Sequence, residues 1–171
     1  MIFAADCQYF DNSAVCAGIL FNHWDSPTAC DSLVKTVTQI APYIPGEFYK
    51  RELPCIMALI EALPQLPDIV VVDGYVALGK QQKPGLGMHL YHALKQQVPI
   101  IGVAKKEFID TPSEAKIFRG KSQNPLYISS VGIELAAAKP AILAMHGKFR
   151  IPTLLKYVDQ LARGIKSCDK H

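Results

Sequence analysis

The sequence has no apolar run long enough to cross a bilayer, no large net charge and no two cysteines at Cys-x-x-Cys spacing. A membrane-spanning helix needs about 20 consecutive apolar residues, so we expect a soluble protein that does not bind membranes. Since half of the residues are hydrophobic and only 19% are charged, intrinsic disorder is excluded. A net charge of +3 is too small to identify a partner.

Nucleotide-binding loops and zinc motifs are also missing. Gly79-Lys80 is followed by Gln81, where a phosphate-binding loop requires Ser or Thr, and the Gly85-x-Gly87 segment lacks the third glycine of a dinucleotide fingerprint. The five cysteines are odd in number and lack zinc or redox spacing, so we expect them to be reduced. A catalytic thiol at Cys7 is conceivable, but burial as a small apolar side chain is favoured.

A length of 171 residues suits one domain, which we take to span residues 1–171. Met1 leads directly into the apolar segment Ile2-Phe3-Ala4-Ala5, with no basic region before it. We interpret this segment as a first strand and not as a signal peptide, and therefore expect a cytoplasmic location. We also expect a monomer.

Hydrophobic periodicity predicts an antiparallel three-strand meander followed by parallel strands that alternate with helices. The predicted strands span residues 2–9, 15–24, 33–40, 68–72 and 99–104, and the predicted helices span residues 47–63, 85–95, 134–144 and 153–163. A strand, a helix and a second strand in succession favour a right-handed parallel crossover. The predicted fold class is therefore α/β, a ribonuclease H-like mixed sheet with flanking helices.

Three carboxylates accompany apolar segments of this predicted sheet. Asp73 ends the apolar run Val70-Val71-Val72, which is typical of a strand buried on both faces, and an ionised carboxylate there needs a partner such as a cation. Asp6 follows the first apolar segment, and Glu52 lies at the head of an apolar helix. If the three converge, their oxygens would bind Mg²⁺ or Mn²⁺.

Basic residues are unevenly distributed. The segment from residue 74 to residue 124 contains eight basic residues and only three acidic ones. The basic residues are Lys80, Lys83, Lys95, Lys105, Lys106, Lys116, Arg119 and Lys121. A basic surface beside an acidic site suits a phosphate backbone, although charge alone favours an ordinary solvated surface equally well.

Several linked motifs together resemble those of endonuclease V, in their order and approximate spacing. They are Asp6-Cys7-Gln8-Tyr9, Pro42-Tyr43-Ile44-Pro45-Gly46-Glu47-Phe48, Arg51-Glu52-Leu53-Pro54, Val72-Asp73-Gly74, Gly85-Leu86-Gly87-Met88-His89-Leu90, Ile101-Gly102-Val103-Ala104-Lys105 and Phe149-Arg150-Ile151-Pro152. The resemblance spans nearly the whole chain.

The resemblance implies a metal-dependent endonuclease that cuts DNA or RNA containing deaminated adenine, at the second phosphodiester on the 3′ side. It implies that Asp6, Glu52 and Asp73 hold the metal and that Lys105 lies beside the scissile phosphate. The residues it assigns to the substrate form a strand-opening wedge (Tyr43, Ile44, Pro45) and a pocket for the flipped base (Gly46, Gly74, Gly85, Gly102, Ala104).

Four features depart from the family pattern. Only five residues precede Asp6, where the family usually has a helix, and a His-Pro-Arg element is replaced by residues 78–83. Tyr75 follows Gly74 where a smaller or polar residue is common. The family places a His or Asp after a glycine near residue 132, whereas this chain has Ile133, so Glu134 or His146 would have to compensate.

Two alternatives to this enzyme remain open. The first is a nucleic-acid-binding relative that does not cut or has a different specificity, and the second is a protein-interaction role for the apolar surface. The sequence does not distinguish DNA from RNA, because no residue can be assigned to a ribose 2′-hydroxyl.

Overall fold

The fold is built on a seven-stranded mixed sheet in the order β3-β2-β1-β4-β7-β9-β8. This arrangement comes from a computed structural model that describes residues 1–165. The sheet strands are β1 (Ile2–Phe10), β2 (Ser13–Phe21), β3 (Asp31–Thr38), β4 (Ile69–Asp73), β7 (Ile100–Ala104), β8 (Lys116–Ile117) and β9 (Leu126–Val131). The helices are α1 (Tyr49–Glu61), α2 (Leu86–Ala93), α3 (Leu135–Ala144) and α4 (Thr153–Ala162), with a short 3₁₀ turn, η1 (Ser113–Ala115).

The predicted antiparallel meander is confirmed. β1 pairs with β2 from Ile2 opposite Phe21 to Phe10 opposite Ser13, and β3 adds to the outer side of β2. The turn between β1 and β2 falls at Asp11 and Asn12, which have the turn chemistry that such a short connection needs.

The parallel part of the sheet is β1, β4 and β7, which run side by side in the same direction. β9 was not predicted, and it runs antiparallel to β7, with β8 pairing on its outer side. A separate two-stranded ribbon, β5 (Ala77–Leu78) and β6 (Lys83–Pro84), projects from the loop after β4. The sheet is therefore mixed, as predicted, but it has an additional antiparallel side.

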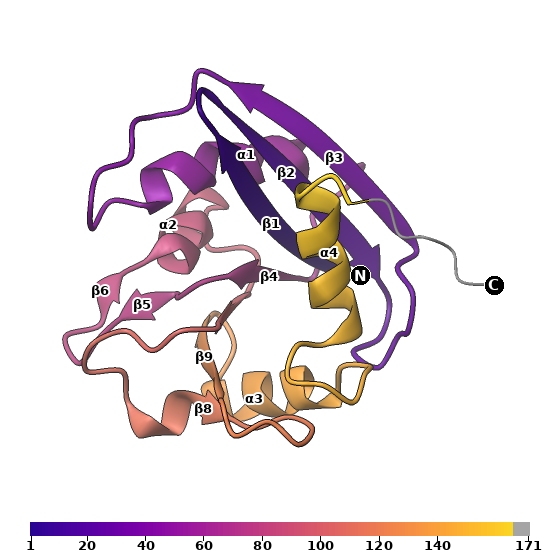
Figure 1. Ribbon diagram of the computed structural model, residues 1–171, viewed down its shortest axis with the longest axis vertical. Helices are drawn as coiled ribbons and strands as arrows, with labels where there is room; N and C mark the ends of the chain where they lie inside the picture. The colour runs from indigo at the N-terminus through magenta and orange to yellow at the C-terminus, as the bar shows by residue number, and fades with distance from the viewer. Residues whose placement is uncertain (166–171) are drawn as a thin grey trace.

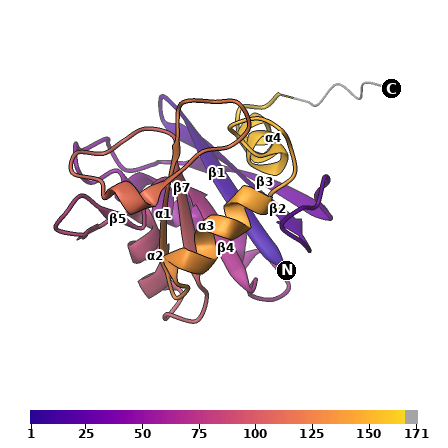
Figure 2. The ribbon, with the colours of Figure 1, turned by 90° about the horizontal axis from the view of Figure 1, so that it is seen from below.

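Helices cover both faces of the sheet. The core on one face joins buried residues of α1 and α2 to alternate residues of the central strands, and the core on the other face does the same with α3 and α4. Figure 1 shows α4 in front of β1 and β2 with α1 behind them, and Figure 2 shows the layers from below. Within the described part of the chain, no helix is long and apolar enough to cross a membrane.

Candidate active site at the carboxyl ends of the parallel strands

Asp6 and Asp73 lie on adjacent parallel strands at the same end of the sheet. Ala5 pairs with Val72 across the β1–β4 ladder, so the two aspartates are the next residues of their strands. Successive side chains of a strand alternate between faces. Asp6 therefore lies on the same face of the sheet as Ala4, and Asp73 on the same face as Val71. Ala4 and Val71 both belong to the core beneath α3 and α4.

Lys105 joins this pair from the third parallel strand. It directly follows β7, whose Val103 pairs with Asp73 and packs in the same core. The Lys105 Nζ atom donates a hydrogen bond to Asp73 Oδ2 at 3.1 Å. A small cavity beneath α4 is lined by Asp6, Asp73 and Lys105. The sheet register thus brings these three predicted residues together.

Glu52 reaches the same end of the sheet from the opposite face. It lies in the first turn of α1 and is only 6% exposed. Glu52 and Asp73 line the same pocket. Asp73 also lines the small cavity beside Asp6. Asp6 and Glu52 therefore line two different pockets, and Asp73 lines both.

Burial and mutual repulsion affect the protonation of two of these carboxylates. Burial, followed by the charge of Asp73, raises the pKa of Asp6 to about 7. Burial, followed by Asp6 and Asp73, raises the pKa of Glu52 well above its ordinary value. For Lys105, burial opposes the charged form, but the neighbouring carboxylates outweigh it and raise its pKa. The site thus concentrates negative charge that one lysine neutralises only in part.

Asp159 is a fourth acidic residue of the site, and sequence reasoning missed it. It lies in α4 and accepts a long hydrogen bond, 3.5 Å, from Gln8 Nε2 of β1. Its charge raises the pKa of both Asp6 and Lys105, which places it near them. Its carboxylate also forms an ion pair with Arg163, the residue that follows the end of α4.

The signal for Asp159 in the sequence is weak. It follows Val158 on an amphipathic helix, where an acidic residue normally faces solvent. The fourth position expected near Gly132 is in the wrong part of the fold, because Val131 pairs with Ile100 at the amino end of β7, away from Lys105. Neither Glu134 nor His146 lines either pocket at the carboxylates.

Beside Glu52 and Asp73 is a pocket of about 290 Å³. Three of the predicted pocket glycines line it, namely Gly46, Gly74 and Gly85. Gly46 and Gly74 have positive φ angles of 81° and 139°, which side chains rarely adopt. Aromatic side chains complete much of the wall: Phe48, Tyr49, Tyr75 and Phe108.

Gly102 supports this pocket from below and does not line it. A Cβ atom at Gly102 would lie 2.5 Å from the Gly74 carbonyl oxygen and 2.8 Å from Ser129 Oγ. Ala104 is likewise buried, at the end of β7. Both small residues therefore let the segment after β4 pack closely against β7.

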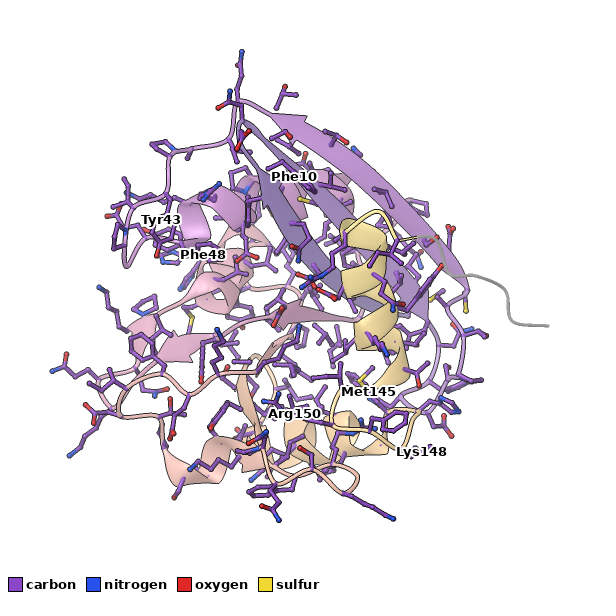
Figure 3. The ribbon with its side chains drawn as sticks, viewed as in Figure 1. Phe10, Tyr43, Phe48, Met145, Lys148 and Arg150 are labelled. Atoms are coloured by element: carbon purple, nitrogen blue, oxygen red, sulfur yellow. The ribbon has the colours of Figure 1, made fainter. Side chains whose placement is uncertain are left out.

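The predicted wedge is displayed outside the pocket. Tyr43 is 60% exposed and Ile44 is 44% exposed, and Pro45 follows them in the loop before α1. The Tyr43 ring contacts Phe48 edge to face, with ring centroids 6.1 Å apart. Figure 3 shows Tyr43 and Phe48 together on the α1 side of the molecule. The loop therefore presents an aromatic group next to the pocket.

Two departures from the family pattern have structural counterparts. The Tyr75 hydroxyl donates to the Lys106 carbonyl oxygen at 2.7 Å and accepts from the Phe108 N–H at 3.1 Å, so it ties the pocket wall to the loop after β7. Residues 78–83, which replace the His-Pro-Arg element, form the tip of the β5–β6 ribbon.

Cys7 is a buried, unpaired thiol in the core on the α1 side. Hydrogen bonds with the thiols of Cys16 and Cys55, together with burial, raise its pKa. The thiolate is the nucleophilic form of cysteine, so this environment agrees with the packing interpretation and not with a catalytic thiol. Cys168 lies outside the described residues.

The donor set suits a hard divalent cation in its chemistry. Asp6, Glu52 and Asp73 supply carboxylate oxygens, which Mg²⁺ and Mn²⁺ prefer, and a cation would offset the burial and the repulsion that raise the pKa of the first two. Across residues 1–165, no three His, Cys, Asp or Glu side chains are already arranged as a metal-binding cluster. Metal binding would therefore require side-chain adjustment.

A mixed sheet of this order, with carboxylates at the ends of neighbouring parallel strands, defines a protein of the ribonuclease H-like class. The endonuclease V family model matches residues 1–135, and the chain belongs to that family. Endonuclease V of Azotobacter vinelandii is 31% identical over 152 residues, covering 77% of this chain and 67% of that protein. Endonuclease V of Streptomyces coelicolor is 33% identical over 144 residues, covering 71% of this chain and 60% of its own length. The chain thus spans about two thirds or less of these relatives.

Solved structures agree on the fold. Endonuclease V of Streptomyces avermitilis superposes with a TM-score of 0.74 at 26% identity, covering 95% of this chain and 79% of that one. Endonuclease V of Ciona intestinalis, solved with a 23-mer DNA containing an inosine, has a TM-score of 0.75 at 17% identity and covers 95% of this chain and 83% of that one. At 17% identity, the second likeness concerns the fold alone.

Proposed function

We propose that this protein is a divalent-metal-dependent endonuclease that cleaves nucleic acid on the 3′ side of a deaminated adenine. The observation that carries the proposal is the sheet register, which puts Asp6 and Asp73 side by side with Lys105 at the carboxyl ends of three parallel strands. Family membership supports nuclease activity as the chemistry of this site.

Asp6, Glu52 and Asp73 would hold Mg²⁺ or Mn²⁺, with Asp159 completing the acidic surroundings. When bound, such a cation lowers the pKa of an attacking water and offsets charge on the leaving oxygen. Lys105, whose ammonium group already lies 3.1 Å from Asp73, would stabilise the negative charge of the scissile phosphate.

The pocket of about 290 Å³ would receive the flipped base. An enzyme that selects a modified base must take it out of the stack, and glycines such as Gly74 and Gly85 let main-chain groups approach its edge. The exposed Tyr43, followed by Ile44 and Pro45, would fill the gap that the base leaves. Since residues 78–83 lack the His-Pro-Arg element, we expect weaker discrimination between inosine and adenine than the family usually shows.

Cleavage of matched oligonucleotides tests this function. Single- and double-stranded DNA and RNA, each with one inosine or with adenine at that position, are incubated with Mg²⁺, Mn²⁺ or EDTA. We expect metal-dependent cuts 3′ to the inosine, and no cuts by Asp73→Asn if its fold is intact by circular dichroism. Unchanged cleavage by Asp73→Asn would contradict a metal role for that residue.

A second function follows from the departures from the family pattern, since Ile133 stands where the family has a His or Asp and residues 78–83 replace the His-Pro-Arg element. In that case the protein binds nucleic acid through the same surface without cutting it. The same assay separates the two functions, because this alternative predicts salt-dependent binding in every metal condition and no cleavage product.

A further inference from the structure

The carboxylates lie between two hollows that share walls with the same central cavity. On one side is the pocket of about 290 Å³ beside Glu52, which shares Asp73 with the cavity beside Asp6. On the other side is a hollow of about 370 Å³, which shares Lys105 and Ile151 with that cavity. The second hollow continues along α4 into a third of about 760 Å³ through Phe149, Ile151 and Lys156. The carboxylates and Lys105 are therefore bordered by a hollow on each side.

Phe149 is the exposed aromatic side chain on this second side. It is 67% exposed and lines both hollows next to α4. The Lys148 Nζ atom lies 5.6 Å from the centre of its ring. An exposed aromatic ring beside a cation is what proteins present to an unpaired base and its phosphate.

The loop that displays Phe149 is held in place by a buried arginine. Arg119 is 5% exposed, and its guanidinium donates to the carbonyl oxygens of Met145, Gly147 (3.1 Å) and Phe149 (2.7 Å). Among the ion pairs of the described residues, none involves Arg119. Its donors are thus used on backbone carbonyls, which keeps the loop in one conformation before any ligand binds.

The charges around this hollow are mostly basic: Asp159 is the one acidic residue that lines it, and its carboxylate is paired with Arg163. Lys148 and Lys156 are exposed and, in the part of the chain that the structure describes, neither is in an ion pair. Arg150 lines the hollow too, and it donates to the carbonyl oxygens of Lys105 and Pro125. Figure 3 shows Arg150 and Lys148 on the side away from Tyr43 and Phe48.

We propose that the hollow beside Phe149 is the subsite for the nucleotide immediately 3′ of the cut, with its base stacked on the Phe149 ring. Lys148 and Lys156 neutralise the phosphates that follow. The direction rests on the proposed function: if the flipped base occupies the pocket beside Glu52 and the cut falls on its 3′ side, the strand beyond the carboxylates is the 3′ segment. We take the occupant to be single-stranded, since a base inside a duplex has both faces covered by its neighbours and leaves none for the Phe149 ring.

Binding of single-stranded, inosine-containing DNA tests the subsite without requiring cleavage. One series ends at the expected cleavage point or extends one, three or six nucleotides beyond it, and a second series is extended only on the 5′ side. Dissociation constants are measured by fluorescence anisotropy in EDTA at low salt. Each 3′ extension should tighten binding by the wild type. Phe149→Ala should weaken the affinity for the extended strands roughly tenfold and should leave the affinity for the strand that ends at the cut unchanged.

Matched variants make the result specific. Phe149→Trp should restore binding, because a larger ring still stacks. Phe118→Ala removes another exposed phenylalanine, 58% exposed, which lines none of these hollows, and should behave as the wild type. An abasic nucleotide immediately 3′ of the cut should remove the difference between the wild type and Phe149→Ala.

Three results would overturn the proposal: an equal loss for every strand length, a loss that follows the 5′ extension, or no loss at all. The proposed function fails separately, by absence of metal-dependent cleavage. A protein that does not cut but shows the Phe149-dependent gain from 3′ nucleotides keeps the subsite and loses only the nuclease activity.

Discussion

Replacing Asp6 with asparagine should stabilise the metal-free protein at neutral and alkaline pH. Burial and the charge of Asp73 raise the pKa of this carboxyl from 3.8 to about 7, so its ionised form is disfavoured in the folded state. An amide has nearly the same shape and no charge. Its oxygen can still accept the hydrogen bond that the Cys7 N–H gives to Asp6 Oδ1 at 2.8 Å.

The sign follows from which state releases its proton first. Below about pH 3.8 the carboxyl is protonated in both the folded and the unfolded state, and it does not lower the free energy of unfolding. Between this pH and about 7 the unfolded chain ionises first, so the free energy of unfolding falls as the pH rises. Above pH 7 the full cost is about 4 kcal/mol, at 1.36 kcal/mol for each pKa unit. We expect Asp6→Asn to exceed the wild type by about 2 to 4 kcal/mol at pH 8 and to match it near pH 4.

Urea unfolding in EDTA at pH 4, 6 and 8 measures this difference. Asp110→Asn is the matched control, because Asp110 is exposed and its positive φ of 58° is one that asparagine tolerates. Added Mg²⁺ should then raise the melting temperature of the wild type at pH 8 but not that of Asp6→Asn. Parallel stability curves for the wild type and Asp6→Asn across this pH range would refute the argument from burial and repulsion.

Three further changes probe other parts of the site. Gly102→Ala would put a Cβ atom 2.5 Å from the Gly74 carbonyl oxygen, so we expect a loss of about 1 to 3 kcal/mol in urea unfolding and a larger loss of cleavage; wild-type values for both would contradict the close packing. Tyr43→Ala should slow cleavage of double-stranded substrate more than that of single strands, and an equal effect on both would argue against a wedge. Lys105→Ala should reduce the turnover number more than the affinity for nucleic acid, as single-turnover kinetics and binding can separate; a loss of affinity alone would leave Lys105 as a binding residue only.

Local patterns were sufficient to predict most of the fold. The hairpin of β1 and β2, the helix that carries Glu52 and the strand that ends at Asp73 follow from alternation, turn residues and an apolar run. β9 was missed because Ser129 and Ser130 interrupt its apolar pattern, and its antiparallel direction depends on pairing with β7. Such pairing joins segments that no local window contains.

The site was predictable only in part, for the same reason. Asp6 and Asp73 could be selected because each is an acidic residue in an apolar setting, and sheet register does the rest. Asp159 has no such setting, since an acidic residue in an amphipathic helix normally faces solvent, and only tertiary packing brings it near Asp6 and Lys105. Gly102 was predicted as a pocket residue, but its observed place is beneath the pocket.

The charged residues of the site lie in β1, α1, β4 and α4 and directly after β7, which means from the first to the last described element. Moreover, α1 and α4 pack on opposite faces of the sheet, so their carboxylates meet only after both layers have docked. A chain emerging from the ribosome with its amino end first cannot contain the complete set until α4 has been synthesised. On the proposed function, we therefore expect a chain that ends before α4 to lack both Asp159 and the helix layer over Asp6, and to cut nucleic acid less well than the full chain.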